Sequence, residues 1–383
     1  MAFAGVSDHI RRLAAVACRV IVDARSVLFA FAISRLVVLV ILVFGRGVIG
    51  RGWFWQPGDT LGAFTQWDSV YYLHIARHGY FHSPATSDTV AFFPMFPLLT
   101  RAASLIFHDF RAAGVATANI CLLVSGVLLH RLVRVDFADR RVADAAVTFL
   151  MFSPVSFFFS VAYTEATFLM FAIATFLAAV RGRWWLAGVC GMCLAATRNV
   201  GFWVAIPLFL EHLRQAWDAQ RPLKVLFHRR LLAIALVPLG LALFMLLGYW
   251  KGNDLLAFSH AGAKWGRVLV TPLQTLSTAK YNDPFYQWLF LGALTLAGLA
   301  WCAGAVIRLR LSYLVWATLL VGTYLCSNSL EAIPRYLSVV FPFFIVAGII
   351  AVRFPAAYEP LLAVSVMLLT LCTLLLANGY WMT

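Results

Sequence analysis

Long runs of apolar residues constrain this chain more than any other feature of its sequence. The runs at 27–44, 231–249 and 361–377 are each long enough to cross a hydrocarbon layer of about 30 Å as a helix. Of the 383 residues, 62% are apolar and only 12% are charged, which excludes a soluble domain. A transmembrane barrel would show alternating strands of about ten residues instead of continuous runs. The sequence therefore predicts an all-α polytopic membrane protein, with residues 1–383 as one integral membrane domain.

The apolar runs predict about eleven transmembrane helices. Two of them, 184–197 and 199–210, are too short to cross the hydrocarbon layer upright. Short spans of this kind are tolerated as re-entrant pairs or half-helices where they line a cavity, and we expect that arrangement here. The eleven runs are 27–44, 114–130, 143–161, 166–180, 184–197, 199–210, 231–249, 287–307, 311–326, 337–352 and 361–377.

The distribution of basic residues predicts which ends of the helices face the cytoplasm. A net charge of +14 would suggest a nucleic acid partner in a soluble protein, but cytoplasmic loops of membrane proteins collect positive charge without one. With the N-terminus in the cytoplasm, the inner loops hold 18 of the 30 Lys and Arg residues and the outer segments hold 11. We therefore expect a plasma-membrane protein with no nucleic acid partner. On this topology the polar segments 45–113, 250–286 and 327–336 share the outer face, where a reaction should occur.

The first outer loop, 45–113, holds a polar and aromatic stretch that packing in a membrane does not require. Trp67-Asp68 is expected to start a helix that runs to about His78 and ends at Gly79, and the loop is long enough for one or two interfacial helices. Asp68 could cap this helix and complement its dipole. Alternatively, Asp68 could be a general base at the membrane surface. Position alone leaves both interpretations open.

Three histidines in the same loop raise the question of a metal site. His74 and His78 have the i, i+4 spacing of a zinc-binding helix, and His82 follows one turn later. However, Ile75 stands where a zinc protease of that type carries its glutamate base. We therefore expect surface histidines and no metal site.

Charged residues also stand at the edges of apolar runs, where they are costly and by default indicate a site. Glu165 lies at the outer mouth of two predicted spans, and Arg198 and Arg335 carry the opposite charge at the same level. The planar fork of arginine suits phosphate, but a structural ion pair with Glu165 would also explain these residues. Arg35, within the first run, is expected to extend toward the inner interface.

Four blocks of residues occur together in one known family, in the same order. They are Trp67-Asp68, Tyr72, Ile75, Gly79-Tyr80, Ala91-Phe92-Phe93-Pro94 and Pro97; Ser153-Pro154, Phe159-Ser160 and Tyr163-Thr164-Glu165; Arg198-Asn199-Val200-Gly201; and Pro334-Arg335-Tyr336 with Phe341-Pro342. With these blocks the chain resembles the PIG-V family of GPI mannosyltransferases, and it looks like a prokaryotic member. The resemblance covers most of the chain. Each motif alone is short, but four in order are specific.

The resemblance implies a GT-C glycosyltransferase whose active site lies on the outer face. The implied donor is a polyprenyl-phosphate mannose, and the implied acceptor is a glycolipid or lipoglycan. Transfer would invert the anomeric carbon, and no cofactor is implied. Asp68 matches the first-loop acid of the family and is expected to be catalytic. The residues expected to bind substrate are Trp67, Tyr72, Tyr163, Glu165, Arg198, Asn199, Arg335 and Tyr336.

This chain departs from the family pattern at one place. Phe81-His82-Ser83 stands where members often carry an acidic residue soon after the Gly-Tyr pair, so the role of that acid is unfilled or has moved to Asp88.

Two other classes of protein share some of these features. A secondary transporter or lipid flippase would suit many spans and intramembrane charge, but it predicts inverted repeats and polar groups near the midplane. The sequence has no visible repeat, and its polar groups cluster at one face. The third possibility is a non-catalytic subunit or lipid-binding scaffold that keeps the fold. It would be favoured if Asp68 had lost its function while the protein kept its binding partners.

Overall fold

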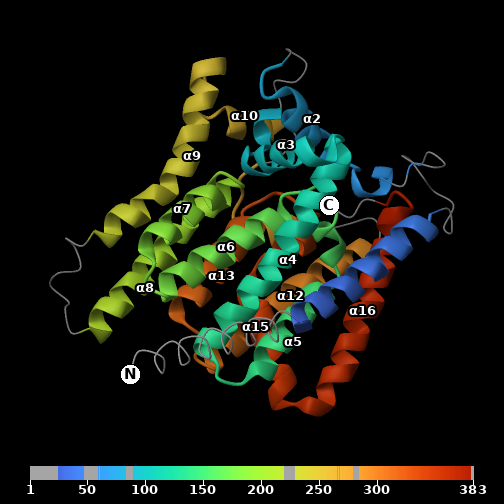
Figure 1. Cartoon of the computed structure of the whole chain (residues 1–383), viewed down its shortest axis with the longest axis vertical. Coiled ribbons are helices and arrows are strands. Elements are labelled where there is room, and N and C mark those ends of the chain that lie inside the picture. The colour runs from blue at the N-terminus through green and yellow to red at the C-terminus, as the bar shows by residue number, and fades with distance from the viewer. Residues whose placement is uncertain are drawn as a thin grey trace, which may run out of the picture.

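The computed structural model shows a bundle of helices (Figure 1). Within the described residues, the extended pairing consists of one isolated antiparallel bridge between Leu269 and Ser327. The prediction of an all-α protein is therefore confirmed. The described residues are 25–46, 59, 61–82, 89–219, 229–264, 266, 268–278 and 284–380.

Five helices in this part of the chain are long and apolar enough to cross a membrane. Each coincides with a predicted run, because a long apolar segment can satisfy its backbone polar groups in lipid only by forming a helix. The chain is accordingly a multi-pass membrane protein. The five are Arg25–Phe44, α4 (Phe110–Asp136), α9 (Arg230–Gly252), α12 (Pro284–Val306) and α16 (Pro355–Ala377).

The other predicted runs fall on shorter helices, so the count of eleven spans stays a prediction. Run 143–161 is interrupted after α5 at Ser153-Pro154, because proline cannot continue the hydrogen-bond ladder of a helix. Run 199–210 begins as a 3-10 helix and becomes α-helical only at Ala205. The shorter elements are α5 (Arg140–Met151), η3 (Ser156–Phe159), α6 (Glu165–Val180), α7 (Trp184–Ala195), η4 (Asn199–Val204), α8 (Ala205–Asp218), α13 (Leu311–Leu325) and α15 (Phe341–Arg353).

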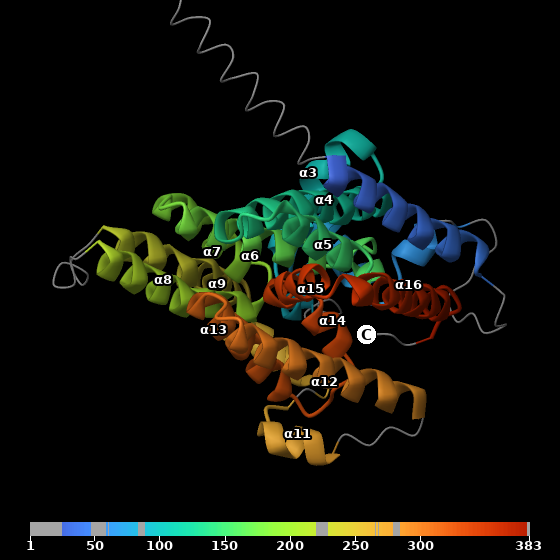
Figure 2. The ribbon, with the colours of Figure 1, turned by 90° about the horizontal axis from the view of Figure 1, so that it is seen from below.

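Short helices form within the segment 45–113, and their place at a membrane interface stays a prediction. In Figure 1 its two longer helices, α2 and α3, lie together with α10 at the top of the view, beyond the end at which α4 begins. In Figure 2, α11 lies at the lower margin, beneath α12. The elements in the segments predicted to be outer are η1 (Leu61–Phe64), α2 (Ser69–His78), α3 (Met95–Phe107), α10 (Ala257–Lys264), α11 (Pro272–Thr278) and α14 (Ile333–Leu337).

Glycines allow the short helix α7 to lie directly against α9. A Cβ atom added to Gly240 of α9 would stand 2.0 Å from the backbone oxygen of Met192 on α7. A Cβ atom on Gly188 of α7 would stand 2.1 Å from the backbone oxygen of Ala233. Small residues let the backbones of membrane helices approach in this way, so packing between α7 and α9 depends on them.

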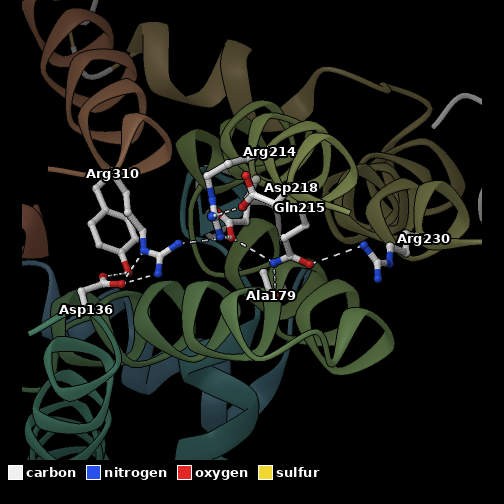
Figure 3. Close-up of polar contacts among 9 residues, drawn as sticks. Asp136, Ala179, Arg214, Gln215, Asp218, Arg230 and Arg310 are labelled. Atoms are coloured by element: carbon white, nitrogen blue, oxygen red, sulfur yellow. Dashed lines mark hydrogen bonds and ion pairs between the residues drawn. The ribbon is translucent and has the colours of Figure 1, made fainter. Parts of the chain in front are cut away.

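A polar network ties several helices together at the C-terminal end of α4, away from α2 (Figure 3). Arg310, which precedes α13, forms an ion pair with Asp136 at the end of α4, and the hydroxyl of Tyr313 donates to the same carboxylate at 2.9 Å. Arg310 also reaches the Oε1 atom of Glu211 on α8, at 3.5 Å. One arginine thereby links α4, α8 and α13.

Glu211 is the centre of this network. Its carboxylate is buried, and it accepts hydrogen bonds from Arg214 at 2.6 Å and from the side-chain amide of Gln215 at 2.9 Å. Gln215 in turn donates to the backbone oxygen of Ala179 near the end of α6 and accepts from Arg230 of α9 (Figure 3). A buried charge is tolerated only when its partners are complete, as they are here.

The packing of α7 on α9 generates a direct test. Replacing Gly240 with Ala inserts a methyl group into a backbone contact, and overpacking of this kind typically costs about 1–3 kcal/mol. We therefore expect Gly240→Ala to lower the thermal unfolding midpoint of the detergent-solubilised protein by several degrees. Gly292→Ala on α12 is the matched control, because nothing lies within 4 Å of its added methyl group. Equal midpoints for the two variants would contradict the close contact.

Candidate active site

Four charged side chains from distant parts of the chain meet at one end of the helix bundle. The Oε1 atom of Glu165 accepts hydrogen bonds from Nη2 of Arg198 and from Nε of Arg335. Arg335 also donates through Nη1 to Oδ2 of Asp68, at 2.7 Å. Two carboxylates and two guanidiniums therefore alternate in one connected chain, and their formal charges cancel.

Three of the four residues stand at the start of a structural element, and the fourth lies within a short helix. Asp68 directly precedes α2, and Glu165 is the first residue of α6. Arg198 directly precedes η4, and Arg335 lies on the short helix α14. Their arrangement brings residues 267 positions apart within hydrogen-bond distance.

Asp68 does not cap α2. The residue has backbone angles φ −55° and ψ −23°, and its side chain makes no capping hydrogen bond. Trp67 before it adopts a left-handed φ of 55°, which is uncommon for a bulky residue and turns the chain sharply there. The carboxylate is consequently free to pair with Arg335, and 30% of the side chain is exposed. The capping interpretation is therefore wrong, and a reactive role for Asp68 becomes sterically possible.

The two arginines are buried among aromatic rings. The guanidinium carbon of Arg335 lies 4.4 Å from the ring centre of Tyr163, and that of Arg198 lies 5.4 Å from the ring centre of Tyr336. Side-chain exposure is only 4% for Arg335 and 11% for Arg198. Cation–π contacts of desolvated arginines add to the ion pairs and fix the planes of the guanidiniums.

Tyr72 and Trp67 lie on the α2 side of the site. Tyr72 is buried and makes edge-to-face contacts with Phe92 at 5.0 Å and with Phe96 at 5.6 Å. Burial raises the pKa of Tyr72 to about 12, so its hydroxyl stays neutral at physiological pH and cannot be the base. Trp67 is partly buried and packs against the main core.

Asn199 differs from its neighbours. It is exposed, and its side-chain oxygen accepts a hydrogen bond from the backbone N–H of Val200 at 2.8 Å. The side chain thus supports the start of η4. The structure gives Asn199 no contact with the four charged residues, although Arg198 next to it belongs to them.

The aromatic run at 91–97 joins the site to the second outer segment. Phe92 stacks on Tyr71 at 4.8 Å, while Phe93 contacts Phe244 of α9 at 4.7 Å and Phe258 of α10 at 5.5 Å. These contacts hold α2 and α3 against α9 and α10. The run therefore fixes the position of the helix that follows Asp68.

The sequence did not predict two residues of the site, for different reasons. Thr164 accepts a hydrogen bond from Nε of Arg198 at 2.9 Å, a role that its motif does not reveal. Tyr324 stacks on Tyr336 with ring centres 4.6 Å apart, but it lies inside an apolar run that gives no signal of a site.

The expectation that Arg35 extends to the inner interface is wrong. Its guanidinium points into the protein, where it donates to the backbone oxygens of Met151 and Ser156 and to the hydroxyl of Ser160. These contacts anchor η3 and the turn that leads to Glu165. A charged residue inside an apolar run is the signal that could have indicated this role.

The three histidines lie close together, with His78 and His82 exposed and Nε2 of His74 buried. The ring centres of His74 and His78 lie 4.9 Å apart, and those of His78 and His82 lie 4.8 Å apart. Across the described residues, no group of three or more His, Cys, Asp or Glu could hold a metal ion. Asp88, the acid that follows the histidines, lies outside the described residues.

Solved structures with the same fold include ArnT and an archaeal oligosaccharyltransferase. ArnT from Cupriavidus metallidurans bound to undecaprenyl phosphate superposes with a TM-score of 0.58 at 15% identity, covering 90% of this chain and 63% of that chain. An oligosaccharyltransferase from Archaeoglobus fulgidus tethered with an acceptor peptide gives 0.53 at 13% identity, covering 92% and 55%. At such identities the likeness shows the fold alone, which is GT-C.

Sequence comparison identifies the family. The GPI alpha-1,6-mannosyltransferase 2 of Mus musculus is 28% identical over 209 residues, which are 49% of this chain and 41% of the relative. The human protein of the same description is 30% identical over 138 residues, or 33% and 27% of the two chains. The alignments thus span less than half the length of these relatives. The sequence model described as Mannosyltransferase (PIG-V) matches residues 56–369. The chain belongs to the PIG-V family of mannosyltransferases.

Proposed function

We propose that the protein transfers mannose from a polyprenyl-phosphate-mannose donor to a glycolipid or lipoglycan acceptor, with inversion at the anomeric carbon. The observation that carries this proposal is the position of Asp68. Its carboxylate does not cap α2, is partly exposed, and pairs with the buried Arg335, which shares Glu165 with Arg198. A reachable base beside a phosphate-binding charge is the arrangement that glycosyl transfer from a lipid phosphate needs.

In the proposed reaction, Asp68 accepts the proton of an acceptor hydroxyl as that oxygen attacks C1 of mannose. The bond between C1 and the phosphate oxygen breaks on the opposite face, and the electron pair leaves with the polyprenyl phosphate. The transition state has oxocarbenium character, as in other glycosyl transfer. The arginines stabilise the negative charge that develops on the leaving phosphate, because guanidinium groups bind phosphate oxygens strongly. No cofactor takes part in this scheme.

The lipid nature of both substrates is supported by the relatives. ArnT, which shares the fold, was solved with undecaprenyl phosphate, and the curated relatives act in GPI mannosylation according to their descriptions. A transporter or flippase has no comparable support, since the charged residues cluster at one end of the helices rather than along a path. We therefore propose polyprenyl phosphate as the lipid of the donor and a glycolipid or lipoglycan as the acceptor.

We further propose that the site faces outward from the plasma membrane, with the N-terminus in the cytoplasm. Support comes from the opposite ends of the helices, where Arg131, Arg181 and Arg183 are exposed. Excess basic residues mark the cytoplasmic ends of membrane helices. Glu165 begins α6 and Arg181 follows its end. The four charged residues of the site and the exposed Arg131, Arg181 and Arg183 therefore belong to opposite faces.

In this scheme Glu165 has a structural role, which is to compensate the two buried arginines. Replacing it with Gln leaves both guanidiniums without their shared counter-charge, and breaking a buried pair in this way typically costs about 3–5 kcal/mol. We expect Glu165→Gln to lower the unfolding midpoint strongly, as measured by thermal unfolding in detergent. Glu331→Gln, an exposed residue close to Arg335 in sequence, should change the midpoint little. An unchanged midpoint for Glu165→Gln would remove this role.

The role of Asp68 is tested by Asp68→Asn, which keeps the shape of the side chain but removes its basicity. Loss of a general base typically lowers the rate by about 10²–10⁴-fold. We expect this loss in mannose transfer from radiolabelled polyprenyl-phosphate mannose to membrane lipid extract, while binding of the donor persists.

Asp59→Asn is the matched control, because Asp59 pairs with Arg111 on the surface of the same outer region at 2.7 Å. It should keep most of the activity, since surface ion pairs contribute little. Full transfer by Asp68→Asn would show that another residue is the base.

A further inference from the structure

Three buried polar atoms around Glu165 remain without hydrogen-bond partners in the part of the chain that the structure describes. They are Nη1 of Arg198, the second carboxylate oxygen of Glu165 (Oε2) and the hydroxyl oxygen of Tyr324. Leaving a buried polar group unpaired costs about 1–3 kcal/mol, and more when the group is charged. Other such atoms are scattered through the described residues, but here three share one place and two of them belong to charged groups, which indicates a polar ligand.

Tyr324 stands beside Arg198 without using its hydroxyl. The residue lies near the end of α13 and is only 6% exposed, so its hydroxyl is withdrawn from water. Its ring stacks on Tyr336, whose ring in turn faces the guanidinium of Arg198. The hydroxyl lies next to that guanidinium, which has donors but no acceptor, so the hydroxyl proton finds no acceptor there. Both groups are therefore donors available to the same ligand.

The guanidinium of Arg335, unlike that of Arg198, pairs with two carboxylates. Its Nε atom donates to Glu165, its Nη1 atom donates to Asp68, and Tyr163 covers the face of the guanidinium at 4.4 Å. A phosphate at Arg335 would compete with two carboxylates that already pair with this guanidinium. Arg198 can accept a phosphate while keeping its bonds to Glu165 and Thr164.

We propose that Arg198 and Tyr324 form the phosphate subsite of this enzyme, and that Arg335 positions Asp68. This inference rests on the proposed function and assigns its sugar phosphate to specific atoms. The two unpaired donors, Nη1 of Arg198 and the hydroxyl of Tyr324, suit a phosphodiester, which has only acceptor oxygens. The remaining atom, Oε2 of Glu165, is an acceptor and suits a hydroxyl of the sugar. The occupant that satisfies all three is a glycosyl phosphate on a lipid.

The direct test is binding of polyprenyl phosphate to the full-length protein, with polyprenyl alcohol as the ligand that lacks the phosphate. Tyr324→Phe removes one hydroxyl and leaves the ring stack on Tyr336 intact. A hydrogen bond to a charged group contributes about 1.5–3 kcal/mol, so we expect binding of polyprenyl phosphate to weaken about tenfold or more. Binding of polyprenyl alcohol should not change. Arg198→Lys, which loses the planar fork, should weaken phosphate binding further.

Tyr313→Phe is the matched control for this experiment. It makes the same change on the same helix, but its hydroxyl belongs to the distant network around Asp136. Polyprenyl phosphate should bind this variant as tightly as it binds the wild type. Equal affinity of Tyr324→Phe and wild type for polyprenyl phosphate would overturn the subsite while leaving the proposed function standing. Failure of the wild type to bind either polyprenyl phosphate or its mannosylated form would instead overturn the proposed function.

Discussion

The buried carboxylate of Glu165 is the group on which the rest of the site depends. One of its oxygen atoms accepts hydrogen bonds from both Arg198 and Arg335. Two guanidiniums at the edge of a hydrocarbon layer could not remain buried without such a shared counter-charge. Because Arg335 is held by Glu165, it can in turn hold Asp68 at 2.7 Å. Glu165, which lies 97 positions later in the chain, thus sets the position of the proposed base Asp68 through Arg335.

The helices were largely predictable from the sequence, because the bilayer restricts a long apolar run to a single solution. The same argument could not settle the short runs. Ser153-Pro154 interrupts one of them, and Gly188 lets α7 pack at backbone contact with α9. Whether a segment of 12 to 16 residues spans the membrane depends on such neighbours, which periodicity and hydropathy do not contain.

The charged residues of the site were predictable because charge at the edge of an apolar run is costly. Their partners were not, since pairing is set by contacts between elements far apart in sequence. Position alone therefore left Asp68 open as a helix cap, and nothing in an apolar run distinguishes Tyr324 from a core tyrosine. Arg35 is the opposite case. Its charge was apparent in the sequence and was predicted to extend to the inner interface, but the side chain anchors the turn before Glu165.

The lengths of α6 and α7 determine the depth of the site. At 1.5 Å per residue, the 16 residues of α6 rise about 24 Å and the 12 residues of α7 rise about 18 Å, while the hydrocarbon layer is about 30 Å thick. Arg181 and Arg183 hold the other ends of these helices at an interface. On the proposed topology, Glu165 and Arg198 would accordingly lie below the opposite lipid headgroups. A lipid phosphate that reaches them must sink beneath its neighbours in the leaflet, where bulk water is scarce and an activated sugar is protected from hydrolysis.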